Sequence, residues 1–104
     1  MKIKPYPIKT ARQDANKNLV PNIADSIAAS LNQRIEQASK EGKDWVDLSY
    51  TIWDYVCLEN LNKIMTLLHD AYATEGYVIT LTYKQKGEAC YTIQIMCEWG
   101  EREE

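Results

Sequence analysis

Three glycines divide this 104-residue sequence into segments that differ in the spacing of their apolar residues. Gly42 and Gly76 each follow a stretch with helical spacing, and Gly87 lies between two strand-like stretches. Glycine is favoured at helix C-termini and in tight turns because it adopts left-handed backbone conformations without steric cost. The pattern therefore predicts a helix, a strand, a second helix and two further strands, in that order.

Two stretches carry apolar residues every three or four positions, the spacing that places them on one face of an α-helix. The first follows Pro21 and ends at Gly42, and the second ends at Gly76. Ahead of Pro21, Thr10 and Gln13 fit a capping box, which predicts a short separate helix to about Lys17. The predicted core-facing positions are Ile23, Ile27, Leu31, Ile35 and Ala38 in the first helix and Leu58, Leu61, Ile64, Met65, Leu68 and Tyr72 in the second.

Three stretches alternate between apolar and polar residues in the way typical of half-buried β-strands. They run from Trp45 to Thr51, from Tyr77 to Tyr83 and from Ala89 to Trp99. The last two are joined by residues 84–88, whose composition predicts an antiparallel hairpin. The predicted core-facing positions are Val46, Leu48, Tyr50 and Ile52 in the first strand and Tyr91, Ile93, Ile95, Cys97 and Trp99 in the third.

These elements predict an α+β fold in which a three-stranded mixed sheet carries both helices on one face. If the first two strands pair in parallel, the helix between them makes a right-handed crossover. Residues 1–20 form a short basic N-terminal arm, residues 21–99 a single α+β domain, and residues 100–104 a charged tail. The other sheet face is expected to turn the following residues toward solvent or a partner: Trp45, Ser49, Thr80, Thr82, Thr92, Gln94 and Met96.

Composition narrows the class of protein. With 45% hydrophobic and 26% charged residues, the chain lies in the ordinary globular range rather than the disordered one. No apolar run approaches the roughly 20 residues of a membrane helix, and the N-terminus lacks the apolar core of a signal peptide. Three cysteines are an odd number, and Cys90 and Cys97 fall on opposite faces of one strand. We therefore expect a cytoplasmic protein with free thiols and no membrane contact.

Charge is distributed unevenly along the chain. The formal net charge is −3, yet residues 1–22 hold five basic residues and one acidic residue, which leaves −7 for the remainder. A basic arm can follow a phosphate backbone, but an acidic body repels a polyanion. We therefore expect the arm to dock on its own domain or on a neighbouring subunit, and we do not expect nucleic acid as a partner.

Motifs for catalysis, metal binding and nucleotide binding are missing from the sequence. His69 is the only histidine, and neither an HExxH nor a CxxC spacing occurs. We interpret His69 as a surface residue on the polar side of its helix, and the pair Asp44 and Asp47 as solvated charges beside an edge strand. Glycine-rich phosphate loops and GxSxG elbows do not occur either. The sequence predicts no enzyme activity, no metal and no cofactor.

Aromatic residues are the one distinctive class, with seven tyrosines and three tryptophans but no phenylalanine. Tyr and Trp combine apolar area with a hydrogen-bonding tip, which suits half-exposed contact surfaces. Trp45, Trp53 and Tyr55 surround the first strand and its exit, and with Tyr50 they are the candidate binding residues. The alternative is that these rings only cover one end of a small sheet.

The sequence also resembles small uncharacterised α+β proteins encoded by bacteriophages and prophages. The resemblance spans most of the chain and lies in Thr10-Ala11-Arg12, Glu41-Gly42-Lys43, Glu75-Gly76-Tyr77-Val78, and the final segment from Tyr91-Thr92-Ile93 to Trp99. It implies a small accessory protein that binds a host or viral protein, assembles into a particle or sequesters a nucleotide signal.

Taken with the residue patterns, this resemblance leads us to expect a non-enzymatic binding protein that acts through protein–protein contacts. The partner is either a host factor or a second copy of the chain, which makes a homo-oligomer one expected form. The location is then the cytoplasm of the host cell. Two alternatives stay open, a protein that sequesters a nucleotide or other small ligand, and a virion or assembly component.

Overall fold

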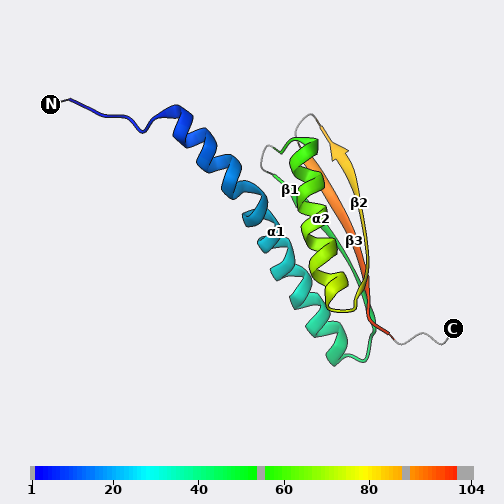
Figure 1. Cartoon of the computed structure of the whole chain (residues 1–104). Helices are drawn as coiled ribbons and strands as arrows, with labels where there is room; N and C mark the ends of the chain where they lie inside the picture. The colour runs from blue at the N-terminus through cyan, green and yellow to red at the C-terminus, as the bar shows by residue number, and fades with distance from the viewer. Residues whose placement is uncertain (1, 54–55, 88–89, 101–104) are drawn as a thin grey trace.

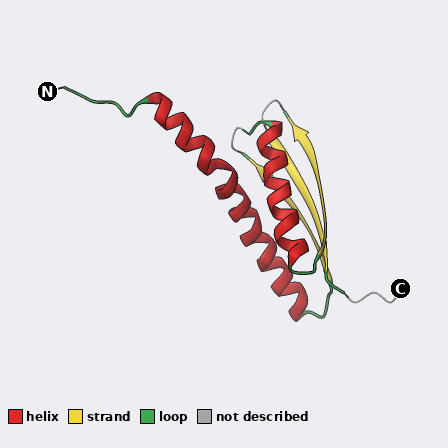
Figure 2. Cartoon of the chain, viewed as in Figure 1, coloured by secondary structure: helices red, strands yellow, loops and turns green. Residues whose placement is uncertain are grey.

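The computed structural model describes residues 2–53, 56–87 and 90–100. It has two helices, α1 (Ile8–Lys40) and α2 (Leu58–Thr74), and three strands, β1 (Trp45–Ile52), β2 (Val78–Lys86) and β3 (Cys90–Glu98). Figure 2 shows that both helices lie on the same side of the sheet. The predicted α+β class, the order of elements and the placement of the helices on one face are confirmed.

Helix α1 is longer than the sequence predicted. A single helix of 33 residues contains Pro21 in its interior, so the prediction of a short separate helix that ends before this proline is wrong. Proline fixes a φ that an α-helix accepts and removes only one backbone donor. The core contacts of Val20 and Ile23, on either side of Pro21, hold the backbone helical through this position. The division of the chain at residues 20 and 99 into arm, domain and tail stays a prediction.

The sheet is antiparallel throughout, with the strand order β1-β3-β2. The expected mixed sheet is therefore wrong, because β3 lies between β1 and β2 and these two strands do not pair. The registers of the two ladders align residues in rows across all three strands, for example Val46, Cys97 and Ile79. The hairpin predicted for the last two strands is confirmed, as β2 pairs antiparallel with β3.

The core lies between the sheet and the two helices, with α1 beside β1 and α2 beside β2 (Figure 1). The predicted inner positions of β3 are largely confirmed, since Ile93, Ile95 and Cys97 are fully buried. Leu58 was predicted on the buried face of α2 but is 45% exposed, because it is the first residue of this helix. The other fully buried large side chains are Ile27, Leu31, Ile52, Leu61 and Ile64.

Both helices end at the predicted glycines. Gly42 and Gly76 have φ angles of +84° and +101°, in the left-handed region that glycine occupies without strain. The next residue in each case bonds back into the helix: Lys43 N–H donates to the carbonyl of Ala38 at 2.9 Å, and Tyr77 N–H to that of Tyr72 at 3.1 Å. These bonds satisfy carbonyls that the helix end would otherwise leave unpaired.

Two ionisable groups are buried in this core. Burial, and to a lesser degree the charge of Glu98, raises the pKa of the Cys97 thiol from 9.0 to about 11. Burial likewise raises the pKa of Tyr72 from 10.0 to about 12. The Tyr72 hydroxyl lies 2.6 Å from Oδ1 of Asn32 and 3.2 Å from the carbonyl oxygen of Ala28, so it links α2 to α1.

These shifts predict a loss of stability in alkali. Between pH 9 and 12 the unfolded chain ionises the Cys97 thiol and the Tyr72 hydroxyl, whereas the folded chain keeps them neutral. Their contribution to the free energy of unfolding is therefore fully present below pH 9 and declines as the pH rises from 9 to 12. We expect Cys97 alone to account for about 2 kcal/mol of the free energy of unfolding lost by about pH 10.5. Urea denaturation of the wild-type chain and Cys97→Ala, at neutral pH and at this pH, measures the difference. Equal losses in the two proteins would contradict the assignment.

Candidate binding surface on the open sheet face

The face of the sheet that points away from both helices is built from alternate residues of all three strands. The two registers pair each residue of β3 with one residue of β1 and one of β2. The side chains of the three residues in such a row point to the same face of the sheet. One row consists of Trp45, Glu98 and Val78, and the next two consist of Asp47, Met96 and Thr80 and of Ser49, Gln94 and Thr82.

One end of this face exposes three apolar side chains. Trp45 at the start of β1 is 49% exposed, Val78 at the start of β2 is 60% exposed, and Met96 in β3 is 46% exposed. Met96 is the diagonal neighbour of the other two across the ladders, a distance that long side chains bridge. We call these three residues the open-face patch. Glu98 lies between Trp45 and Val78 in their row, and Asp47 lies beside Met96 in the next row, so acidic residues alternate with the members of the patch.

Beyond the patch, the open face is polar, and it carries the charge of Lys84 in the row that contains Thr51 and Thr92. Ser49, Thr80, Thr82 and Gln94 line a hollow of about 360 Å³ that reaches Met96. One row further on, Thr92 was expected to face solvent or a partner but is buried, and its hydroxyl is hydrogen-bonded to that of Thr51 at 3.1 Å. The hollow therefore offers hydroxyl and amide groups for hydrogen bonds next to an apolar contact area, the combination found at the edge of protein interfaces.

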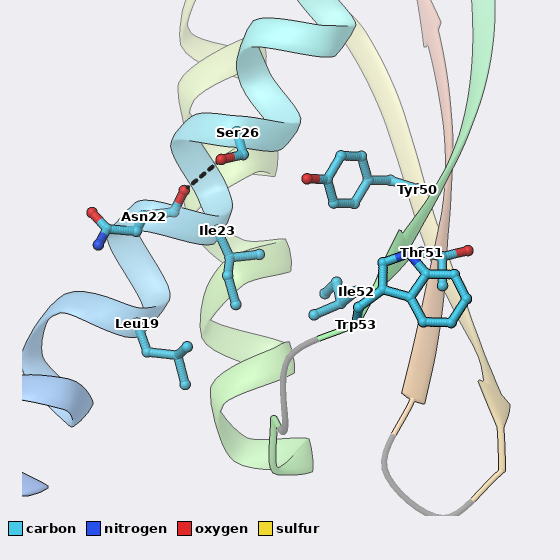
Figure 3. Close-up of a pocket in the computed structure, with 8 residues that line it drawn as sticks. All are labelled: Leu19, Asn22, Ile23, Ser26, Tyr50, Thr51, Ile52 and Trp53. Carbon is cyan, nitrogen blue, oxygen red and sulfur yellow. Dashed lines mark hydrogen bonds between the residues drawn. The ribbon is translucent and has the colours of Figure 1, made fainter.

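A second cavity lies at the other end of β1, between this strand and α1. It has a volume of about 350 Å³. Figure 3 shows the ring of Tyr50 directed toward α1 and the indole of Trp53 beside Thr51. Trp53 is 86% exposed, whereas Tyr50 is only half-buried and packs against the core. The remaining lining residues are Leu19, Asn22, Ile23, Ser26, Thr51 and Ile52.

The structure divides the four predicted binding residues between two places. Tyr50 and Trp53 lie together at the cavity beside α1, while Trp45 lies on the open face at the far end of β1. At about 3.3 Å per residue, a strand separates the backbones of Trp45 and Trp53 by roughly 26 Å. Tyr55 lies outside the described residues. Trp45 and Trp53 therefore do not form a single surface.

The remaining candidate groups do not converge on a site. His69 is at the surface as predicted, with its Nδ1 atom 3.3 Å from a carboxylate oxygen of Asp70. Cys57 is exposed and Cys97 buried, and the thiol of Cys90 donates to the carbonyl of Ile52 at 3.2 Å. Among the described residues, no three His, Cys, Asp or Glu side chains are close enough to hold a metal ion. In the same part of the chain, no helix is long and apolar enough to cross a membrane.

Two features were missed by sequence reasoning. Val78 was not recognised, because its membership of the open-face patch depends on the register that aligns it with Trp45 across β3. The apolar spacing in the first part of α1 was also missed, because a separate short helix was expected to end at about Lys17, before Pro21. Comparison of the chain with protein-family models, with curated proteins and with solved structures found no match.

Proposed function

We propose that this chain is a non-enzymatic binding protein that contacts another protein through the open face of its sheet. The observation that carries this proposal is the exposure of Trp45, Val78 and Met96 in two adjacent rows of a face that neither α1 nor α2 covers. Tryptophan and methionine are enriched in the centres of protein interfaces, and contiguous apolar patches on soluble proteins often mark contact sites. The phage or prophage type, a host factor as the partner and the host cytoplasm as the location are parts of the proposal that rest on the sequence resemblance.

The chemistry of the patch describes the surface that it would fit. Trp45 is the anchor, because tryptophan side chains bury large areas and dominate the energetics of many interfaces. Glu98 lies next to Trp45 on β3, and Asp47 lies next to Met96 on β1, so negative charge lies among the apolar side chains. A partner surface on which apolar and basic groups lie side by side would match both features, since complementary charge guides association and favours the correct register.

Truncation of the patch is expected to weaken binding to this partner at least about tenfold. The partner is first recovered by affinity capture from producing cells with the wild-type chain and is then purified. Calorimetric titration compares the wild-type chain with the double variant Trp45→Ala/Met96→Ala. Both side chains are about half exposed, so their removal leaves the core intact and the loss reports on contact rather than on folding.

Leu67→Ala is the matched control, because Leu67 is 49% exposed on α2, on the opposite side of the molecule from the open face. We expect this variant to bind the partner with unchanged affinity. Full affinity in the Trp45→Ala/Met96→Ala variant would show that the open face is not the contact surface, and the proposal would then be wrong.

Sequestration of a nucleotide is the second candidate, and the observation in its favour is the cavity beside Tyr50 and Trp53. An aromatic ring can stack on a nucleobase, and the cavity volume of about 350 Å³ lies at the lower end of the range for small-ligand sites. However, the eight described residues that line it carry no formal charge, so they supply no cation for a phosphate group. We therefore rank this function below protein binding.

A further inference from the structure

The first part of α1 extends beyond the rest of the molecule (Figure 1). We call residues 8–19 the projecting segment. Those whose burial is described are exposed up to Asn18, Leu19 is half-buried, and Val20 is the first core residue. The molecule measures 69 × 27 × 22 Å, and its radius of gyration is 17.3 Å, against roughly 13 Å for a compact domain of this length.

This shape leaves an unusually large accessible surface. The chain exposes 7968 Å², whereas a compact monomer of 12.0 kDa exposes roughly 6,000 Å². The difference of about 2,000 Å² exceeds the roughly 800 Å² that each partner contributes to a stable interface of standard size. The projecting segment and the chain ahead of it can therefore supply the area that a stable dimer needs.

One face of the projecting segment is apolar. Ile8, Ala11, Ala15 and Leu19 follow one another at spacings of three, four and four residues, which places them along one side of the helix. Leu19 also lines the cavity that contains Trp53, so the apolar stripe leads from the body of the molecule outward to Ile8. Ile8, Ala11 and Ala15 are all exposed.

Apart from a hydrogen bond that the Tyr6 hydroxyl donates to the carboxylate of Asp14, local interactions give this helical segment little support. Its N-terminus has no side-chain cap, its first turn contains no acidic residue, and Lys9 and Arg12 place positive charge near the positive end of the helix dipole. Pro21 further removes a backbone donor where the segment joins the body. Most helical stability in proteins comes from the packing of an apolar face, so a molecule that covered this face would stabilise the segment.

We propose that this cover is a second copy of the chain, and that the projecting segments of two copies pair antiparallel about a two-fold axis. The stripe is self-complementary in this arrangement: Ile8 of each copy lies opposite Leu19 of the other, and Ala11 lies opposite Ala15. The alanines at the centre let the two helices approach closely, while the larger residues pack at both ends. A two-fold contact of this kind closes on itself and gives a dimer rather than a filament.

Charge favours the antiparallel arrangement over the parallel one. Residues 1–22 carry a net charge of +4 and the remainder −7. Antiparallel pairing brings Lys2 and Lys4 of each copy toward the acidic body of the other, so the contact between copies is electrostatically complementary. Parallel pairing would instead bring the two basic N-termini together. The dimer goes beyond the proposed function, because it uses α1 and leaves the open sheet face free in both copies.

The test measures the mass of the full-length chain by size-exclusion chromatography with light scattering. We measure the wild-type chain at about 1–100 μM and expect a mass that approaches twice 12.0 kDa. The fraction of dimer should rise with protein concentration, because association follows mass action. Ala15→Glu places two carboxylates near the axis and is expected to raise the dissociation constant of the dimer at least tenfold. Gln13→Glu is the matched control, since it adds the same charge two residues away on the opposite side of the helix and should leave the dimer intact.

Cross-linking tests the register independently. In a Cys57→Ser background, which removes the exposed thiol, Ala11→Cys and Ala15→Cys are oxidised mildly, each alone and as a mixture. The antiparallel register predicts covalent dimers in the mixture, because residue 11 of one copy meets residue 15 of the other, and few in either variant alone. Efficient cross-linking within each single variant would indicate parallel helices and overturn the proposal.

Two further outcomes would also overturn it. One is a wild-type chain that stays monomeric at every concentration, including a monomer whose projecting segment binds anionic vesicles or nucleic acid instead. The other is a dimer that Ala15→Glu does not weaken, because this dimer would form through another surface. The variants distinguish failure of the dimer proposal from failure of the proposed function. Trp45→Ala/Met96→Ala should still dimerise, and Ala15→Glu should still bind the partner protein through its open face.

Discussion

Replacing Ile93 with alanine is expected to lower the free energy of unfolding by about 2–5 kcal/mol. Ile93 lies at the centre of β3, opposite Tyr50 on one side and Tyr83 on the other, and its side chain is completely buried beneath the helices. The loss combines the transfer free energy of the deleted methyl and methylene groups with the cost of the cavity they leave. Because a domain of this size has a total stability of about 5–15 kcal/mol, the variant should be close to unfolding.

Urea denaturation followed by circular dichroism measures this change. Ile93→Val removes a single methylene and should cost about 0.5–1.5 kcal/mol, which gives a graded comparison at the same position. Gln94→Ala is the control on the neighbouring residue, whose side chain is exposed on the open face, and it should cost no more than about 1 kcal/mol. If Ile93→Ala cost less than Gln94→Ala, the core would not be centred on β3 as described.

The sequence predicted which face of β3 is buried, but the central position of β3 in the sheet was overlooked. Alternation in β3 correctly identified Ile93, Ile95 and Cys97 as buried, because burial of one face imposes a period of two on any strand. The strand order was not predicted, since alternation is the same in central and edge strands. A usable signal was present: β3 carries no charged residue before Glu98, while β1 contains Asp47 and β2 contains Lys84 and Lys86, as edge strands often do.

For the candidate sites too, the sequence predicted which face a residue lies on but not which residues are neighbours across the strands. Exposure of Trp45 followed from its place on the polar side of β1, and the structure confirms that this side faces away from the helices. Grouping Trp45 with Trp53 ignored the length of the strand between them. Val78 could not be found from its own neighbours in sequence, because only the register of β2 and β1 on β3 places it in one row with Trp45 and diagonal to Met96. Tertiary pairing, rather than local pattern, defines the patch.

The error at Pro21 has a physical cause that leads to a measurable consequence. Proline in a helix interior is less favourable than alanine by about 3 kcal/mol, which is why the sequence predicted a break there. The structure keeps α1 continuous, with Val20 and Ile23 buried on either side of the proline. Tertiary burial therefore outweighs a local preference at this position, and the local cost should still be present in the folded chain.

Pro21→Ala is therefore expected to stabilise α1 by about 2 kcal/mol. The substitution restores a backbone donor toward the carbonyl of Lys17 and removes the steric conflict of the ring, for a gain of about 3 kcal/mol. Loss of the proline also raises the conformational entropy of the unfolded chain, and this effect offsets about 0.4–1 kcal/mol of the gain. Hydrogen exchange of the amides at residues 18–25 reports the change locally, and a slowing of at least about tenfold is expected from 1.4 kcal/mol or more.

Pro7→Ala is the control, because Pro7 is the N-cap of α1 and its substitution changes no interior hydrogen bond of the helix. Exchange at residues 18–25 should be the same in this variant and in the wild-type chain. If Pro21→Ala leaves exchange unchanged as well, the helix must be interrupted at Pro21 in solution, as the sequence alone predicted. An interruption there would uncouple the projecting segment from the body, so its pairing with a second copy could no longer be inferred from the continuity of α1.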